Sequence, residues 1–322
     1  MQRNPSGGLS IANTITEKHR ARKLIFACAV LCVLFFAISL PLFLSFAADR
    51  SAENWARGWS EWKRGDAAEA LRFWSKDMWL AAFAPRPARL CYWRARALDE
   101  MGLASEAEEL RRAAAARYPF DFYTFLLYSD GGESPYGEGT ARKTARLFSP
   151  RPWSGEVAKA ASKTGTSDRM IWALMKRESK FQADAVSRNG AVGLMQLMPK
   201  TAEEEARQLH IKTPDLYDPT LNILLGAKHF AILSRRYAGE LPRAIAAYNA
   251  GSASVNRWNT LTAMDWAEWI EEIPYPETRE FVRSVLENAE TSRLAYGTAG
   301  ESPLLQTAGE RPSAIAVAAR RH

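Results

Sequence analysis

Along most of this chain, apolar residues recur three and four positions apart, which is the spacing of one face of an α-helix. In the second half, this pattern predicts a helix that begins at Asp168 and five more after it. The five lie at Pro199–His210, Pro219–Tyr237, Pro242–Asn249, Trp266–Glu271 and Pro276–Leu294. No segment alternates apolar and polar residues convincingly, as a half-buried strand does, so the predicted fold class is all-α.

Residues 49–130 are predicted to form helical hairpins. Tryptophan recurs at helical spacing at positions 55, 59 and 62, a turn follows at Gly65-Asp66, and the helical period resumes over 67–78. The segment Cys91–Tyr128 repeats this design, with two helices that meet at Gly102 and small alanines that permit close packing. We interpret the aromatic stripe as core packing, and a sugar-binding platform is the alternative.

Residues 24–48 contain no charged side chain. This apolar run of about 25 residues is long enough to cross a bilayer core about 30 Å thick. Basic residues between Lys18 and Lys23 precede it, so we expect the tail 1–23 to stay in the cytoplasm and the rest of the chain to be exported. An uncleaved anchor is the preferred interpretation. A cleaved signal sequence is the alternative, because Ser45-Phe46-Ala47 offers small residues for cleavage.

The length of 322 residues exceeds one typical domain, and 47% hydrophobic residues can form an extensive core. Residues 131–152 are rich in Gly, Ser and Pro and are predicted to link the hairpins to a second domain, 153–296. The tail 297–322 has no helical caps or period and is predicted to be disordered. Cys91 is the only thiol beyond the apolar run, so no disulfide can form within the exported part.

Glu178 lies on the apolar stripe of the helix that Ser167 is predicted to cap, because Ile171, Leu174 and Met175 precede it at helical spacing. A carboxylate on such a stripe is costly unless it is paired, hydrogen-bonded or protonated. Burial beside the negative end of a helix also raises its pKa. Such a group suits general acid catalysis near neutral pH. The alternative is an ordinary solvated charge near a helix end.

A glycine-punctuated turn, Asn189–Gly193, follows this helix, and Pro199 is predicted to be the first residue of a new helix. Gln196 and Met198 therefore lie on a loop between two helices. We expect this loop to fold back over the end of the helix that carries Glu178.

Composition narrows the chemistry only in part. A formal net charge of +7 permits an anionic polymer, a membrane surface or nucleic acid as partner. The four histidines, at positions 19, 210, 229 and 322, include no pair at metal-ligand spacing, so no metal site is expected. No phosphate-binding loop or nucleophile elbow appears, and no cofactor is expected. Asp184 and Asp218 are candidates for a second catalytic carboxylate, and each also suits an ordinary turn.

Four segments together resemble a known family. They are ES at Glu178–Ser179, GAVGLMQLMP at Gly190–Pro199, AYNAG at Ala247–Gly251 and IPYPETREFVRSVL at Ile273–Leu286. In this order, and over about 130 residues, they resemble the soluble lytic murein transglycosylases. The resemblance implies a lysozyme-like catalytic domain, and residues 49–130 resemble the superhelical region that precedes it in that family.

The resemblance also implies roles for single residues. Glu178 would protonate the oxygen between N-acetylmuramic acid and N-acetylglucosamine, then accept the proton of the muramic acid C6 hydroxyl as a 1,6-anhydro ring closes. Tyr248 would donate a hydrogen bond to Glu178. The other implied contacts are Ser187 and Gln196 with polar sugar groups, Met198 with a sugar face, Asn249 in the cleft and Glu277 with the stem peptide. The residues alone also allow a core tyrosine, loop-stabilising hydrogen bonds and a helix cap at Glu277.

The resemblance and the apolar run together lead us to expect a membrane-anchored lytic transglycosylase of the bacterial inner membrane, with its catalytic domain in the periplasm. Expected partners are peptidoglycan strands, the membrane through the N-terminal segment, and cell-wall machinery proteins through the helical region. Nucleic acid is not expected. Two alternatives stay open: a hydrolytic muramidase on the same fold, with water as acceptor, and a non-catalytic glycan-binding scaffold.

Overall fold

The computed structural model describes residues 37, 39–41, 43–76, 87–129, 140–258 and 265–297. Every regular element in these ranges is a helix, and the two isolated β-bridges among them, Val186–Val192 and Val192–Leu197, form no strand. The all-α prediction is therefore confirmed. The chain divides into two compact units, 1–90 and 91–322.

The segment predicted to anchor the chain, 24–48, lies mostly outside the described residues. Its end, 43–48, belongs to a helix that continues to residue 64. Among the helices that the structure describes, none combines the length and the apolarity needed to cross a membrane. Of the predicted disordered tail, only Gly297 is described.

In the first unit, the helix over 43–64 is followed by α2 (Ala67–Trp74), and tryptophans fill the space between them. Trp55 stacks on both Trp59 and Trp74, with ring centroids 5.6 and 5.5 Å apart. Trp62 and Trp74 are fully buried. The aromatic stripe is therefore core, as predicted.

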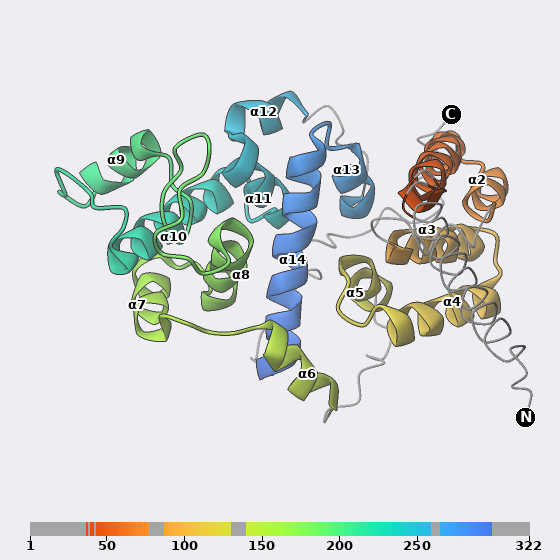
Figure 1. Cartoon of the computed structure of the whole chain (residues 1–322), viewed down its shortest axis with the longest axis horizontal. Coiled ribbons are helices and arrows are strands. Elements are labelled where there is room, and N and C mark those ends of the chain that lie inside the picture. The colour runs from red at the N-terminus through yellow and green to blue at the C-terminus, as the bar shows by residue number, and fades with distance from the viewer. Residues whose placement is uncertain are drawn as a thin grey trace, which may run out of the picture. The chain divides into compact units, whose positions relative to one another are not determined.

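The second unit begins within α3 (Pro87–Glu100) and continues with α4 (Ala104–Arg117) and α5 (Phe122–Ser129), seen in Figure 1. Gly102, with φ of +77°, makes the turn that the sequence predicts after α3. The alanines at positions 95, 97, 107 and 114 are fully buried, which agrees with the close packing expected of them.

A buried carboxylate joins this segment to the C-terminal helices. Glu271, on α13 (Trp266–Glu272), accepts hydrogen bonds from the Trp93 indole N–H at 3.3 Å and from the Tyr123 hydroxyl. It also pairs with Arg283 of α14 (Pro276–Tyr296) at 2.7 Å. A charge buried this deeply is tolerated because several donors satisfy it. Residues 91–129 thus share a polar core with the C-terminal helices.

Part of the predicted linker is helical. α6 (Thr140–Phe148) packs against α14, where the Arg146 guanidinium donates to the Ala295 carbonyl at 3.0 Å and Ala145 is fully buried. The glycines and prolines that suggested a linker lie outside these nine residues, which explains why a helix forms here. Residues 130–139 lie outside the described part of the chain.

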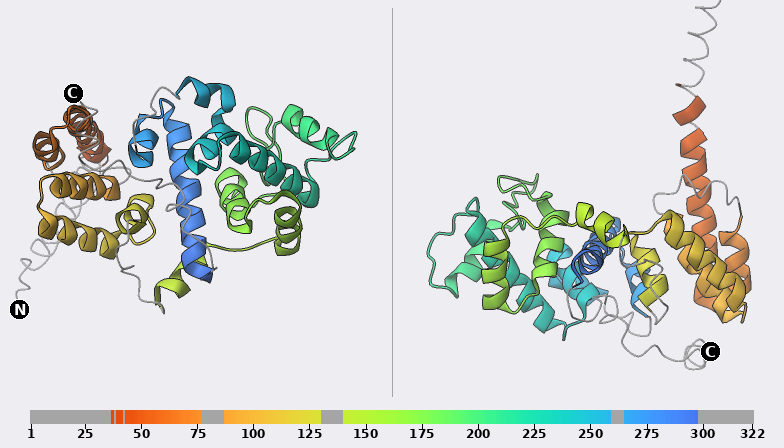
Figure 2. Two further views of the ribbon diagram at one scale, coloured as in Figure 1. Left: turned by 180° about the vertical axis from the view of Figure 1, so that it is seen from behind. Right: turned by 90° about the horizontal axis from the view of Figure 1, so that it is seen from below.

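The long helix α14 organises the second unit. It packs against α5, α6, α8, α11 and α13, and Figures 1 and 2 show α8 and α11 on one side of it and α5 and α13 on the other. The remaining helices are α7 (Ser154–Thr164), α8 (Asp168–Ser179), α9 (Pro199–Arg207), α10 (Pro219–Arg236), α11 (Leu241–Ala250) and α12 (Ser252–Arg257). The predicted starts at Asp168, Pro199, Pro219 and Pro276 are confirmed. Helices α7 and α12 were not predicted.

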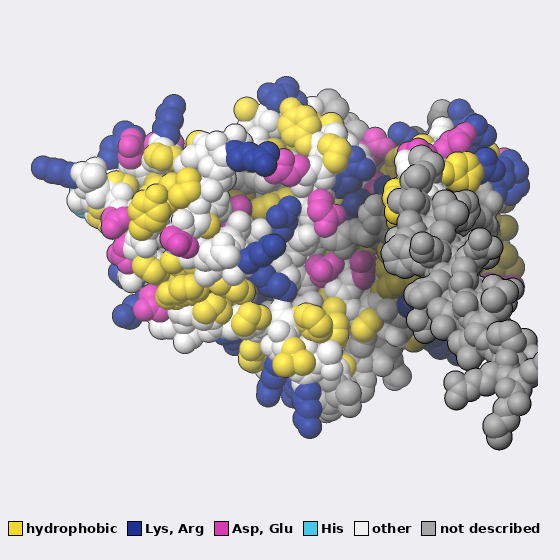
Figure 3. Space-filling view, viewed as in Figure 1, with side chains coloured by type: hydrophobic (Ala, Val, Ile, Leu, Met, Phe, Trp, Pro, Cys, Tyr) yellow, Lys and Arg dark blue, Asp and Glu magenta, His cyan; other side chains and the backbone are white. Residues whose placement is uncertain are grey.

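The positive charge is not gathered in one place on the face drawn in Figure 3. Acidic and basic side chains are interspersed over the described part of that face, with apolar side chains between them. The net charge of +7 reflects a modest excess, 43 basic against 36 acidic residues.

Candidate active site

Glu178 lies in the last turn of α8, and the sequence explains why. The Ser167 hydroxyl caps the start of the helix by accepting a hydrogen bond from the Met170 N–H at 3.3 Å. The helix ends where Lys180 adopts φ of +52°. Ile171, Leu174 and Met175 are fully buried, so the predicted apolar stripe is confirmed, and Glu178 continues it as a half-buried side chain.

The loop between α8 and α9, residues 180–198 (the Met195 loop), folds back over the end of α8, as predicted. The Ser179 hydroxyl donates to the Leu194 carbonyl at 2.8 Å. The Gly193 N–H donates to the Ala185 carbonyl at 2.8 Å, and Val192 forms bridges with both flanks of the loop. The loop is therefore a hydrogen-bonded unit fixed to the residue next to Glu178.

Asn222 on α10 fixes the same loop by hydrogen bonds. This role was not predicted from the sequence. Its side chain is fully buried and accepts a hydrogen bond from the Met195 N–H at 2.8 Å. Its amide donates to the carbonyls of Val192 and Leu216 at 3.0 and 2.9 Å. One turn later, Gly226 leaves room for Met195, since a Cβ there would lie 2.4 Å from the Met195 Sδ. A polar residue on a buried helix face was the signal available in the sequence.

The carboxyl group of Glu178 has an unusual electrostatic setting. Burial raises its pKa to about 8, and the nearby charge of Glu277 adds to this, while Arg177 opposes it. Within the described residues, no group donates a hydrogen bond to this carboxylate, so the charge of Arg177 offsets the loss of solvation only in part. Glu178 is therefore mainly protonated at neutral pH, as a general acid must be.

Tyr248 lies near Glu178 but does not donate to it. Its hydroxyl donates to the Met195 carbonyl at 2.9 Å, and a hydroxyl has only one hydrogen to give. The expected Tyr248–Glu178 hydrogen bond is thus wrong for this structure, because the hydroxyl donates to the Met195 carbonyl instead. The two groups still interact: burial raises the pKa of Tyr248 far above its usual value, and the charge of Glu178 raises it further.

Three of the side chains predicted to contact substrate are hydrogen-bonded to other groups of the protein. The Gln196 amide donates to the carbonyls of Ala185 and Gly193, both at 3.0 Å. The Ser187 hydroxyl accepts from the Ala191 N–H at 2.9 Å, and the side-chain amide oxygen of Asn249 accepts from the Thr278 hydroxyl at 2.7 Å. These bonds fit the loop-stabilising alternative, and sugar contacts at these residues stay a prediction.

The other two predicted substrate contacts are open to solvent. Met198 is 44% exposed at the start of α9, and Glu277 is exposed in the first turn of α14. Of the candidate second carboxylates, Asp218 caps α10 by accepting from the Thr220 N–H at 3.0 Å, and Asp184 is exposed. Among the described residues, no group of three His, Cys, Asp or Glu could hold a metal ion.

Part of the chain is similar in sequence to known proteins. Residues 156–265 match the family model of the transglycosylase SLT domain. The chain is 33% identical over 144 residues to the soluble lytic murein transglycosylase of Escherichia coli, covering 43% of this chain and 22% of the relative. It is 36% identical over 113 residues to the membrane-bound lytic murein transglycosylase C of Yersinia pestis, covering 31% of this chain and 32% of the relative.

A solved structure of similar fold is the 70 kDa soluble lytic transglycosylase from Escherichia coli. The two share 21% sequence identity with a TM-score of 0.62 over 79% of this chain and 52% of the other. The fold is thus similar to that of this solved structure. Glu178, Tyr248 and the loop that contacts both helices lie within the residues that match the SLT domain. The matched part of the chain spans less than a third of the length of each of the two curated relatives named above.

Proposed function

We propose that the chain is a peptidoglycan lytic transglycosylase. The observation that carries this is Glu178: a half-buried carboxyl with a pKa of about 8 and no hydrogen-bond donor among the described residues, at the end of α8 in the matched domain. A group with this pKa can give a proton to a leaving oxygen near neutral pH and take one back. The relatives named as soluble or membrane-bound lytic murein transglycosylases support the substrate class.

In the proposed reaction, Glu178 first gives its proton to the oxygen that links N-acetylmuramic acid to N-acetylglucosamine. The bond from C1 to that oxygen breaks, and the substrate's own N-acetyl oxygen stabilises the positive charge at C1. The Glu178 carboxylate then takes the proton of the C6 hydroxyl as its oxygen bonds to C1 and closes the 1,6-anhydro ring. Atoms balance without water, and one carboxyl group serves as both acid and base.

Mass spectrometry of muropeptides released from purified sacculi tests this proposal. Each anhydro product should be about 18 Da lighter than the hydrolytic product, because no water is added. Hydrated reducing ends would instead identify a muramidase, and Asp184 would be the first candidate for its second carboxylate. Release of no product by the folded protein would favour a non-catalytic glycan-binding scaffold.

The rate of product release should fall as pH rises through about 8, because Glu178 must hold a proton to act as the acid. The measurement is kcat/KM across about pH 5 to about pH 10, which reports the pKa values of the free enzyme. Glu277→Gln removes a charge that raises the pKa of Glu178, so it should move this alkaline limb to lower pH. A limb that does not move in Glu277→Gln would contradict the assignment.

We also propose that residues 24–48 hold the chain in the bacterial inner membrane, with the rest of the chain, including the catalytic domain, in the periplasm. The uncharged run and its basic flank support this. The full chain should stay with membranes through an alkaline carbonate wash, and a protein that begins at Asp49 should not. Recovery of a protein in the soluble fraction that has been cut near Ala47 would indicate a cleaved signal sequence instead.

A further inference from the structure

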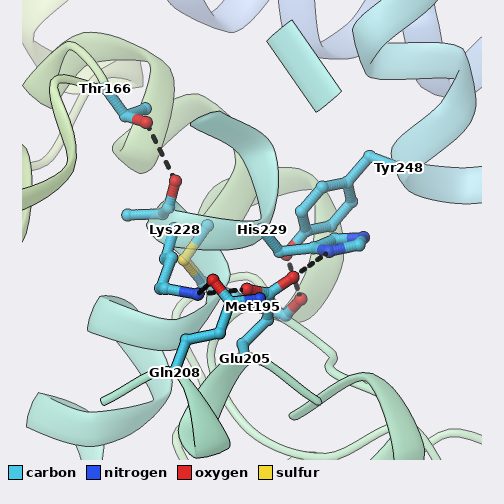
Figure 4. Close-up of polar contacts among 8 residues, drawn as sticks. Thr166, Met195, Glu205, Gln208, Lys228, His229 and Tyr248 are labelled. Atoms are coloured by element: carbon cyan, nitrogen blue, oxygen red, sulfur yellow. Dashed lines mark hydrogen bonds and ion pairs between the residues drawn. The ribbon is translucent and has the colours of Figure 1, made fainter. Parts of the chain in front are cut away.

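A buried charge cluster lies behind the candidate active site, and the proposed mechanism does not use it. Glu205 on α9 is only 5% exposed. One of its oxygens pairs with the Lys228 ammonium at 2.6 Å, and the other lies 3.1 Å from His229 Nδ1; both partners are on α10. Lys228 also donates to the Gln208 side chain at 2.8 Å. Figure 4 shows these side chains converging between the helices.

The cluster reaches the active site through one aromatic contact. The His229 ring packs against the Tyr248 ring, with centroids 5.5 Å apart and planes at 56°. The Tyr248 hydroxyl in turn donates to the Met195 carbonyl, on the loop that covers the end of α8. Figure 4 shows the sequence of contacts from Glu205 through His229 and Tyr248 to Met195.

The Glu205 carboxylate determines how His229 is held. Because a carboxylate only accepts, the Nδ1 that faces it carries a hydrogen, which fixes both the tautomer and the ring orientation. Lys228 offsets the charge of Glu205, so the carboxylate stays ionised although it is buried: hydrogen bonds from His229 and Lys228 hold its pKa below the usual value despite desolvation. The ring that supports Tyr248 is therefore fixed by a hydrogen bond as well as by packing.

We propose that His229 is a positioning residue, which holds the Tyr248 ring, and through it the Met195 loop, closed over Glu178. This inference rests on the proposed function. The charged and titratable groups around His229 are Glu205 and Lys228, then Tyr248, and beyond Tyr248 the carboxyl of Glu178. Loss of the His229 contact loosens Tyr248, lets water reach Glu178 and reduces the desolvation that raises its pKa.

His229→Leu should therefore shift the alkaline limb of kcat/KM to lower pH by about one unit and lower kcat by about tenfold at pH 8. KM should change little, because none of the residues predicted to contact substrate belongs to the cluster. A change that only destabilises the fold lowers the unfolding temperature and leaves the limb of the remaining folded enzyme in place. The position of the alkaline limb in the pH profile of kcat/KM thus distinguishes a positioning role of His229 from a purely structural one.

Two substitutions at Glu205 keep the test valid if His229→Leu fails to fold. Glu205→Gln keeps an acceptor for His229 Nδ1–H and should leave the limb near its original position. Glu205→Leu removes the acceptor and should reproduce the shift. His210→Asn is the matched control: it removes an exposed imidazole at φ of +60°, where asparagine is well tolerated, and should change nothing.

The pKa of Glu178 should also be followed without activity, by NMR titration of carboxyl carbon-13 glutamate with Glu178→Gln for assignment. A lower pKa in His229→Leu and Glu205→Leu, but not in Glu205→Gln, supports positioning. An unchanged pKa in folded His229→Leu overturns it. If the unsubstituted protein releases no anhydro product, the proposed function fails, and the titration still decides on His229.

Discussion

Replacing Glu178 with glutamine should lower the release of anhydro-muropeptides by about a thousandfold. An amide of the same shape cannot give the proton that the leaving oxygen needs, and cannot take the C6 proton afterwards. The surroundings should not change, because the anchoring bond from Ser179 to Leu194 does not involve the Glu178 side chain. Mass spectrometry of released products at matched protein concentration provides the measurement.

The same substitution should make the protein more stable above about pH 5. The pKa of Glu178 is raised in the folded state, from 4.5 to about 8, so its proton stabilises the fold fully below 4.5, and this contribution is lost as pH rises toward 8. Glutamine stays neutral and loses nothing. Discounted because the side chain is only half-buried, the gain in free energy of unfolding at pH 8 should be about 2 kcal/mol.

Denaturant unfolding at pH 4 and pH 8 measures this gain, which should appear only at the higher pH. Glu203→Gln is the matched control, because Glu203 is exposed on α9. A Glu178→Gln protein that keeps its activity would remove Glu178 from the mechanism. Loss of activity with no gain in stability at pH 8 would mean that Glu178 is not desolvated.

Much of this site is predictable because its signals are local. The capping serine, the apolar stripe and the carboxylate of Glu178 on that stripe all lie between Ser167 and Glu178. The glycine turn and Pro199 define the loop that follows. The helix starts at Pro199, Pro219 and Pro276 were predicted correctly for the same reason, whereas α11 begins at Leu241, one residue before the predicted start at Pro242. Propensity and capping act over one or two turns, so the sequence contains them directly.

The rest depends on residues that meet only in the folded chain. Asn222 holds a loop 27 residues away, and His229 lies 24 residues from Glu205. Glu271 gathers donors 148 and 178 residues away. The Tyr248 hydroxyl was assigned to the wrong acceptor, since both acceptors lie near it and only the fold decides between them. Without the distances between side chains in the folded protein, a polar residue that holds the site cannot be told from the other polar residues on the helices.

Replacing Gly193 with alanine should cost the protein about 3 to 4 kcal/mol of its free energy of unfolding. Gly193 has φ of +82°, and a Cβ there would lie 2.2 Å from the Asn222 Nδ2 and 2.5 Å from the Leu216 carbonyl oxygen. Neither atom can move away cheaply. Asn222 would lose three hydrogen bonds, and the Leu216 oxygen is part of the backbone that accepts one of them.

Gly190 provides the matched control for this prediction. It has nearly the same backbone conformation, with φ of +84°, and no atom of the described residues lies within 4 Å of the place that an added Cβ would take. Gly190→Ala should therefore cost only the backbone strain of about 1 kcal/mol. Urea unfolding followed by tryptophan fluorescence compares the two. Equal losses would show that the Met195 loop yields to the added carbon, and then Asn222 could not be what holds the loop over Glu178.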